Sequence, residues 1–125
     1  IVMLFNGAIK RAEEAKRQIE RGSCEGVHNN LIRAQEIIGE LRSALNMNMG
    51  DVPKNLDRIY EYFQHLLITA NVKKSSDPIE KCVVLLTTMR DTWQEAFEAV
   101  ERESGPGRPA PQIRPHGESL LTLQG

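Results

Sequence analysis

The chain has 125 residues and a formal net charge of −1, from 16 lysines and arginines against 17 aspartates and glutamates. This length suits one domain, and the charge balance lacks the basic excess that a nucleic-acid partner requires. The longest apolar runs, residues 1–5 and 82–86, have five residues each, far short of the roughly 20 that a membrane span needs, so membrane insertion is not expected.

Four stretches carry apolar residues at alternating gaps of three and four, a spacing that places them on one face of a helix. The stretches cover residues 5–19, 27–45, 52–70 and 79–100. One amphipathic helix is marginal in water, so the four apolar faces are expected to bury one another. The sequence therefore predicts an all-α fold, an antiparallel four-helix bundle. In the third stretch the predicted core positions are Val52, Leu56, Ile59, Phe63, Leu66 and Ala70.

Local signals predict the ends of the first two helices. The first should end near Arg21, because Gly22 can adopt the left-handed conformation that terminates a helix. Ser23 is the predicted N-cap of the second helix. Residues 47–50, which end in glycine, are expected to close it.

The last two helices have similar signals. Asp51 is the predicted N-cap of the third, which should fade over residues 71–75. Asp77 is the predicted N-cap of the fourth, with Pro78 at the first helical position. Residues 105–107, Gly-Pro-Gly, stop it. Residues 1–104 are thus predicted to form the bundle domain, and residues 105–125 a disordered Pro/Gly-rich C-terminal tail.

The sequence offers little support for metal or cofactor chemistry. A di-iron bundle needs two Glu-x-x-His pairs, and only Glu25 and His28 form one. His28 is predicted on the flank of its helix, His65 in solvent and His116 in the tail. We therefore expect no metal and no cofactor, although a metal or cofactor bundle stays an alternative function.

Nucleophilic catalysis is not expected either. Cys24 and Cys82 are the only cysteines, and no histidine is predictably placed beside one as a base. Both are interpreted as reduced thiols in a reducing compartment. The chain is predicted not to be an enzyme. Residues 106–109 match the PxxP pattern, so a helical adaptor that uses the tail is a further alternative.

Several apolar residues lie off the predicted core stripes. On a helical wheel, Ile32, Ile68 and Val84 point outward, whereas Tyr60, Leu67 and Leu85 flank the seams between helices. Gly39 would let a partner backbone approach closely. Single exposed apolar residues are normal on monomers, but a contiguous patch marks an interaction site. The predicted partner-binding groove residues are Ile32, Ile37, Gly39, Tyr60, Leu67, Ile68, Val84 and Leu85.

Four segments of the sequence are similar to motifs of the flagellar secretion chaperone FliS family. They are LFNGAI at 4–9, NLIRAQEIIGEL at 30–41, LDRIYEYF at 56–63 followed by Ala-Asn at 70–71, and MRDTW at 89–93. Phe5 and Asn6 depart from the family's Tyr and Asp or Glu. The resemblance covers residues 1 to about 100, in order and without large gaps.

The resemblance implies a cytoplasmic helical bundle that binds the disordered C-terminal segment of newly made flagellin. Such a chaperone keeps flagellin from polymerising and delivers it to the flagellar export gate. The family usually has an upstream segment that can cover the groove, and this chain is expected to start inside the first helix. The tail is not typical of the family. Its Leu120, Leu121 and Leu123 are interpreted as part of a solvated tail or, less simply, as a segment that folds back into the groove and competes with flagellin.

Overall fold

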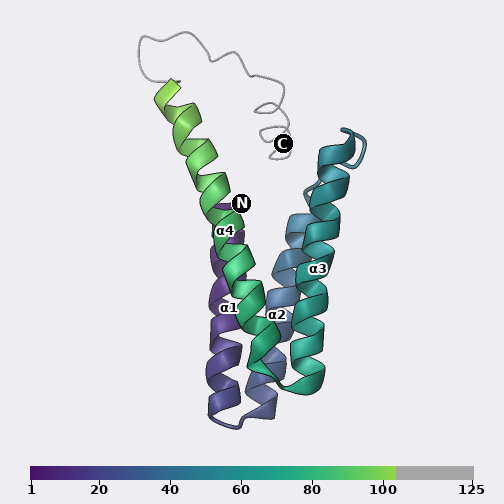
Figure 1. Cartoon of the computed structure of the whole chain (residues 1–125), viewed down its shortest axis with the longest axis vertical. Helices are drawn as coiled ribbons and strands as arrows, with labels where there is room; N and C mark the ends of the chain where they lie inside the picture. The colour runs from purple at the N-terminus through teal and green to yellow at the C-terminus, as the bar shows by residue number, and fades with distance from the viewer. Residues whose placement is uncertain (104–125) are drawn as a thin grey trace.

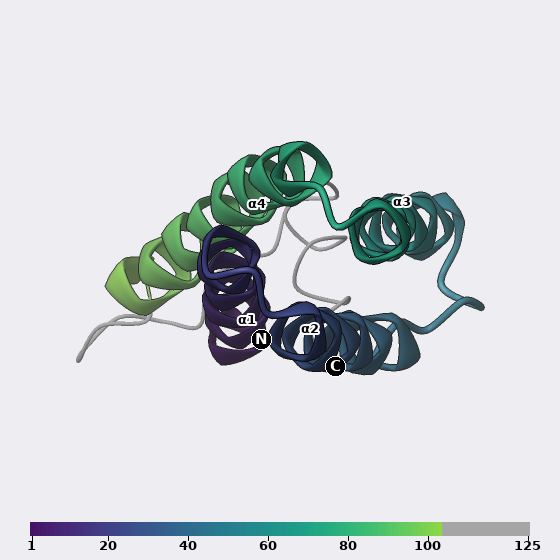
Figure 2. The same cartoon turned by 90° about the horizontal axis from the view of Figure 1, so that it is seen from below.

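The computed structural model describes residues 1–103, which form four helices and, over that range, no strand (Figure 1). The helices are α1 (Val2–Glu20), α2 (Cys24–Ser43), α3 (Asp51–Lys73) and α4 (Ser76–Glu103). Each helix runs antiparallel to the one before it, and α4 returns to pack against α1 (Figure 2). The predicted four-helix bundle is confirmed. The predicted disordered tail, residues 105–125, lies outside the described residues.

The connection between α1 and α2 follows the sequence signals. Gly22 has a φ of 73°, the left-handed conformation that terminates α1, and the Ser23 hydroxyl accepts a hydrogen bond of 3.1 Å from the Gly26 amide. The end of α2 differs, because the helix stops at Ser43 rather than at residues 47–50. The Ser43 hydroxyl donates to a carbonyl of the last turn, that of Glu40. The same carbonyl also accepts a hydrogen bond of 3.2 Å from the Ala44 amide, which ends the helix.

The starts of α3 and α4 each lie slightly before the predicted caps. Gly50, with a φ of 104°, is the N-cap of α3, and Asp51 is its first helical residue. Helix α4 already begins at Ser76, so Asp77 lies inside the first turn, where a carboxylate favours the helix dipole. The two predicted N-caps are wrong. Lys74 ends α3 in the left-handed conformation, and this tight turn lets α4 begin two residues later.

Three aromatic rings from α1 and α3 join the centre of the core. The ring centroids of Phe5 and Tyr60 are 6.2 Å apart, and those of Tyr60 and Phe63 are 6.3 Å apart. Both pairs are tilted, as aromatic side chains prefer. Among residues 1–103 no charged side chain is buried, so burial of apolar surface stabilises the bundle.

The buried face of α3 is rotated from the predicted stripe. Tyr60 and Leu67 are 0% exposed, whereas Val52 is 36% exposed and Ile59 is 39% exposed. The prediction of Val52 and Ile59 as core positions is therefore wrong. The reason is that α3 packs more extensively on α2 than on α4, so the flank that faces α2 is covered and the flank that faces α4 is not.

Helix α4, in contrast, is tied to α1 by two contacts far apart along its length. The Lys16 ammonium lies 3.4 Å from the Glu80 carboxylate, and the Arg90 guanidinium donates a hydrogen bond of 3.0 Å to the Asn6 side chain. These contacts hold α4 alongside α1 from its second turn to its middle.

A polar cluster fixes the register of α2 against α3. Arg42 binds Asp57 through two hydrogen bonds, Nε to Oδ1 at 2.8 Å and Nη2 to Oδ2 at 3.1 Å. The Gln64 side chain accepts from Arg42 at 2.9 Å and donates to the carbonyl of Gln35 at 3.1 Å. The hydrogen bonds from Arg42, together with its positive charge, hold the pKa of Asp57 below its usual value.

The core contains one unpaired hydroxyl. Among the described residues, the buried Tyr60 hydroxyl has no hydrogen-bond partner. Burial raises the pKa of Tyr60 to about 12. The neighbouring Trp93 side chain lowers this pKa slightly, although it makes no hydrogen bond to the hydroxyl.

Substitution Asp57→Asn is expected to lower the free energy of unfolding at neutral pH by up to about 1 kcal/mol, the upper range for partly exposed ion pairs. Because the folded-state pKa of Asp57 is lowered, the pair stabilises the fold above the unfolded-state pKa, and this stabilisation is lost as the pH falls through the folded-state pKa. Urea unfolding of both chains at neutral and acid pH measures the difference. A difference that stays constant into acid would contradict this assignment.

Substitution Tyr60→Phe is expected to leave the free energy of unfolding unchanged within about 0.5 kcal/mol or to raise it, because the removed hydroxyl has no partner to lose. Urea unfolding followed by circular dichroism measures the change. A loss above about 1 kcal/mol would show that the hydroxyl does have a hydrogen-bond partner in solution.

Candidate functional site

The candidate site is an apolar groove between α3 and α4. The two helices are joined by the short turn at residues 74–75 and move apart toward the other end of the bundle, where α4 leans away from α3 (Figure 1). This divergence leaves a cavity of about 600 Å³ along their facing sides. Its size lies within the range of known ligand-binding pockets.

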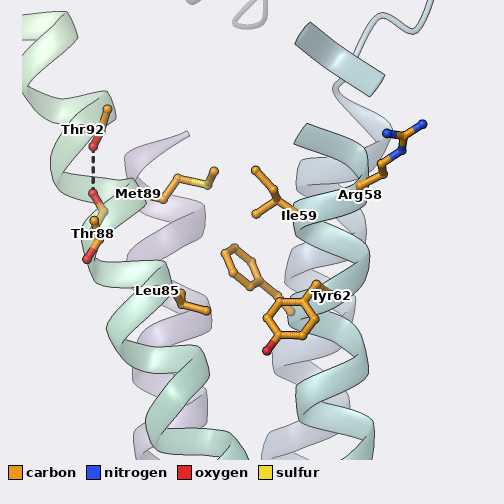
Figure 3. A pocket seen from close by; sticks show the side chains of 8 residues that line it. Arg58, Ile59, Tyr62, Leu85, Thr88, Met89 and Thr92 are labelled. Atoms are coloured by element: carbon orange, nitrogen blue, oxygen red, sulfur yellow. Dashed lines mark hydrogen bonds between the residues drawn. The ribbon is translucent and has the colours of Figure 1, made fainter. Parts of the chain in front are cut away.

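The walls of this α3/α4 groove are mostly apolar. From α4, Leu85 and Met89 project toward α3, and Ile59 and Tyr62 lie opposite (Figure 3). Thr92 turns its hydroxyl to the α4 backbone, where it donates a hydrogen bond of 3.0 Å to the carbonyl of Thr88. The lining residues are Arg58, Ile59, Tyr62, Phe63, Leu85, Thr88, Met89 and Thr92.

The end of the groove near the turn is closed by contacts between α3 and α4. The Lys81 ammonium lies 5.5 Å from the centroid of the Tyr62 ring, a cation–π contact. Next to it, the Cys82 thiol donates to the carbonyl of Phe63 at 3.9 Å. The groove is therefore anchored at one end and open where α3 and α4 diverge.

Four of the predicted partner-binding residues have accessible side chains. Val84 is 64% exposed, Ile68 48%, Ile32 38% and Leu85 36%. They do not share one furrow: Leu85 lines the α3/α4 groove, whereas Val84 lines a second depression, of about 380 Å³, between α1 and α4. That depression also contains Lys16 and Glu80, so it is more polar.

Three other predicted residues lie in the core. Ile37 is 5% exposed, and Tyr60 and Leu67 are fully buried. A Cβ atom on Gly7 of α1 would lie 3.4 Å from the Ile37 side chain, so Ile37 packs between α1 and α2. A role in partner binding stays a prediction for these residues, and direct contact with a partner would require the core to open.

Gly39 is half-buried, and the space beside it is already filled. A Cβ atom at this position would lie 3.6 Å from the Gln64 side-chain nitrogen. Gln64 is held there by its bonds to Arg42 and Gln35. A partner backbone could approach Gly39 only after Gln64 moves, and its role in binding stays a prediction.

Sequence reasoning missed most of the groove. Ile59 and Met89 have core spacing in the sequence and were expected in the core, and Tyr62 received no assignment. The wheel placed Tyr60 and Leu67 on a flank, but it could not tell that this flank is covered by α2. One signal in the sequence points to the groove: α3 carries apolar residues on both flanks of its predicted core stripe, Tyr60 and Leu67 on one and Tyr62 on the other.

The described residues hold no group of side chains that could bind a metal ion, and both of their cysteines are free thiols. Within residues 1–103, no group of three or more His, Cys, Asp and Glu side chains could hold a metal ion. The His28 ring accepts a hydrogen bond of 2.9 Å from Asn71, with the roles set by its tautomer. Both cysteines are unpaired; Cys24 is exposed, and burial raises the pKa of Cys82 to about 12.

Over the described range, no helix combines the length and the apolar content that crossing a bilayer demands.

Comparisons with known proteins identify the family. The family model described as "Flagellar protein FliS" matches residues 1–100. The flagellar secretion chaperone FliS of Bacillus subtilis is 31% identical over 102 residues, 82% of this chain and 76% of the relative. FliS of Vibrio cholerae is 29% identical over 96 residues, 76% of this chain and 71% of the relative. FliSB of Pseudomonas aeruginosa is 31% identical over 94 residues, 74% of this chain and 75% of the relative.

These relatives are all named as chaperones and not as enzymes. The match extends over nearly all of the four helices that form the α3/α4 groove and its support. The chain therefore belongs to the FliS family of flagellar secretion chaperones.

Proposed function

We propose that this chaperone binds the disordered C-terminal segment of flagellin, prevents its premature polymerisation in the cytoplasm and delivers it to the flagellar export gate. Family membership supports the general role, and the relatives are named for flagellar secretion. The single observation that supports the binding step is the apolar α3/α4 groove, which is open along one side.

The chemistry of the groove suits an unfolded client. A disordered segment cannot bury enough apolar surface by itself to fold. Leu85, Met89 and Ile59 offer such surface, and an amphipathic helix laid between two helices is a common form of recognition. Coupled folding and binding of this kind buries on the order of 1,000–3,000 Å², part of whose stabilisation is offset by the ordering of the client.

The accessible predicted residues indicate how the client would extend beyond the groove. Leu85 lies in the groove, whereas Val84, the next residue of α4, faces α1. Ile32 and Ile68 are exposed on α2 and α3. A client that contacts all four would have to wrap around the bundle. The buried residues would then act indirectly, by fixing the positions of the helices that the client contacts. These residues are Ile37, Tyr60 and Leu67.

Sequestration follows from this mode of binding. Flagellin segments that are packed on the bundle are not free to pack on one another. Because the client is held in a partly unfolded form, it would also stay competent for transfer through a narrow export channel. Release at the export gate would require only that contacts with the apolar surface be exchanged, since no covalent chemistry is involved.

Calorimetric titration of a flagellin C-terminal peptide into the chaperone is expected to give saturable binding. Leu85→Glu and Ile68→Glu each place a negative charge on the proposed surface. This charge would be buried without a partner in the complex. Each is expected to weaken binding at least about tenfold, equivalent to 1.4 kcal/mol.

The matched control is Met3→Glu, at an apolar residue of α1 that is 85% exposed and is not among the proposed partner-binding residues. This variant is expected to bind as the unaltered chain does. Circular dichroism confirms that each variant is folded. The absence of measurable binding, or equal affinities for folded Ile68→Glu, Leu85→Glu and Met3→Glu chains, would overturn the proposed function.

A further inference from the structure

The C-terminal segment of this chain has the composition of a ligand for the chain's own groove. Residues 104–117 contain four prolines and three glycines, and they precede a group of leucines at positions 120, 121 and 123. Three leucines within four residues are an apolar cluster that water solvates poorly. The described bundle offers one largely apolar groove of about 600 Å³ that side chains from α1–α4 leave open.

The length of the segment fits the distance that it must cover. Met89 and Leu85 lie 14 and 18 residues before the last described residue, Glu103, which at 1.5 Å per residue is about 21 and 27 Å along α4. The 17 steps from Glu103 to Leu120 have a root-mean-square span of about 23 Å for a flexible chain and reach about 53 Å when extended. The leucines can therefore reach the groove without strain.

The charge along the same path is complementary. The last three turns of α4 carry exposed Glu95, Glu98, Glu101 and Glu103 against one basic residue, Arg102. Residues 104–117 carry Arg108 and Arg114 and no acidic residue. A segment that runs back along α4 would place its two positive charges beside this acidic surface. Arg58 is the only charged residue among those that line the groove. Glu118, two residues before Leu120, carries the opposite charge.

We propose that residues 118–125 dock into the α3/α4 groove of their own chain, with Leu120, Leu121 and Leu123 against Leu85, Met89 and Ile59. A tether whose mean span matches the distance gives an effective concentration on the order of 1 mM. A contact with an intrinsic dissociation constant of about 1 mM is then occupied about half of the time. Any other ligand of the groove meets a site whose free fraction is reduced by the tail, and its apparent affinity falls by the same factor.

A nitroxide at position 122 of the full chain tests this proposal. Thr122→Cys introduces the labelling site, Cys24→Ser removes the exposed thiol, and Cys82 is buried and protected from the label. The label is expected to broaden the amide signals of Ile59, Tyr62, Leu85 and Met89 to about half of their intensity or less if the groove is occupied half of the time. Reduction of the nitroxide should restore these signals.

Two variants provide matched comparisons. Leu120→Ser, Leu121→Ser and Leu123→Ser together should abolish the broadening while they leave the bundle untouched. Leu85→Glu should abolish it as well, whereas Val84→Glu, at the adjacent residue that faces α1, should not. Broadening that survives the serine substitutions, or that Val84→Glu and Leu85→Glu remove equally, would overturn the proposal.

A mixture of two differently labelled chains distinguishes docking within one chain from docking into a second copy. Isotope-labelled chain without a nitroxide is mixed with unlabelled chain that carries the nitroxide. Broadening in this mixture would show that the segment enters the groove of a second copy, which overturns docking within one chain. The absence of broadening at the four groove residues in the singly labelled chain would overturn the proposal altogether.

Discussion

The packing of α3 against α2 is the constraint on which the rest of the structure depends. The bidentate pair of Arg42 and Asp57, together with Gln64, fixes which residues of the two helices lie opposite each other. Once this register is set, Tyr60 and Leu67 must point into the core, where both are fully buried. The flank of α3 that faces α4 then lacks full cover, and Ile59 is left at the surface.

The α3/α4 groove stays open because α4 is held against α1 rather than against α3. Helix α4 follows α1, with contacts from Glu80 to Lys16 and from Arg90 to Asn6. Its contacts with α3 are concentrated near the turn, where Cys82 bonds to the backbone of α3. Closing the groove would require α4 to leave α1, at the cost of the apolar surface buried between those helices. The packing of α4 on α1 thus keeps the apolar α3/α4 groove open.

The fold was largely predictable from the sequence, whereas the site was not. Stripes of apolar residues specify which faces of helices are buried, and this was enough for four helices in a bundle. The position of Ser23 as an N-cap was likewise readable, because the cap acts on the three residues that follow it. The choice between Ile59 and Tyr60 for the core was not readable, since it depends on the distances from α3 to its two neighbours. Gly39 shows the same limit, because Gln64, which fills the space beside it, belongs to another helix.

The largely apolar lining of the α3/α4 groove gives its occupancy a definite thermal behaviour. Whichever segment enters, transfer of apolar surface out of water carries a negative heat-capacity change. The driving force near room temperature is then mostly the entropy of released water, and it weakens on cooling. A chaperone that relies on such a surface holds its guest less firmly in the cold, without any change in the residues that touch it.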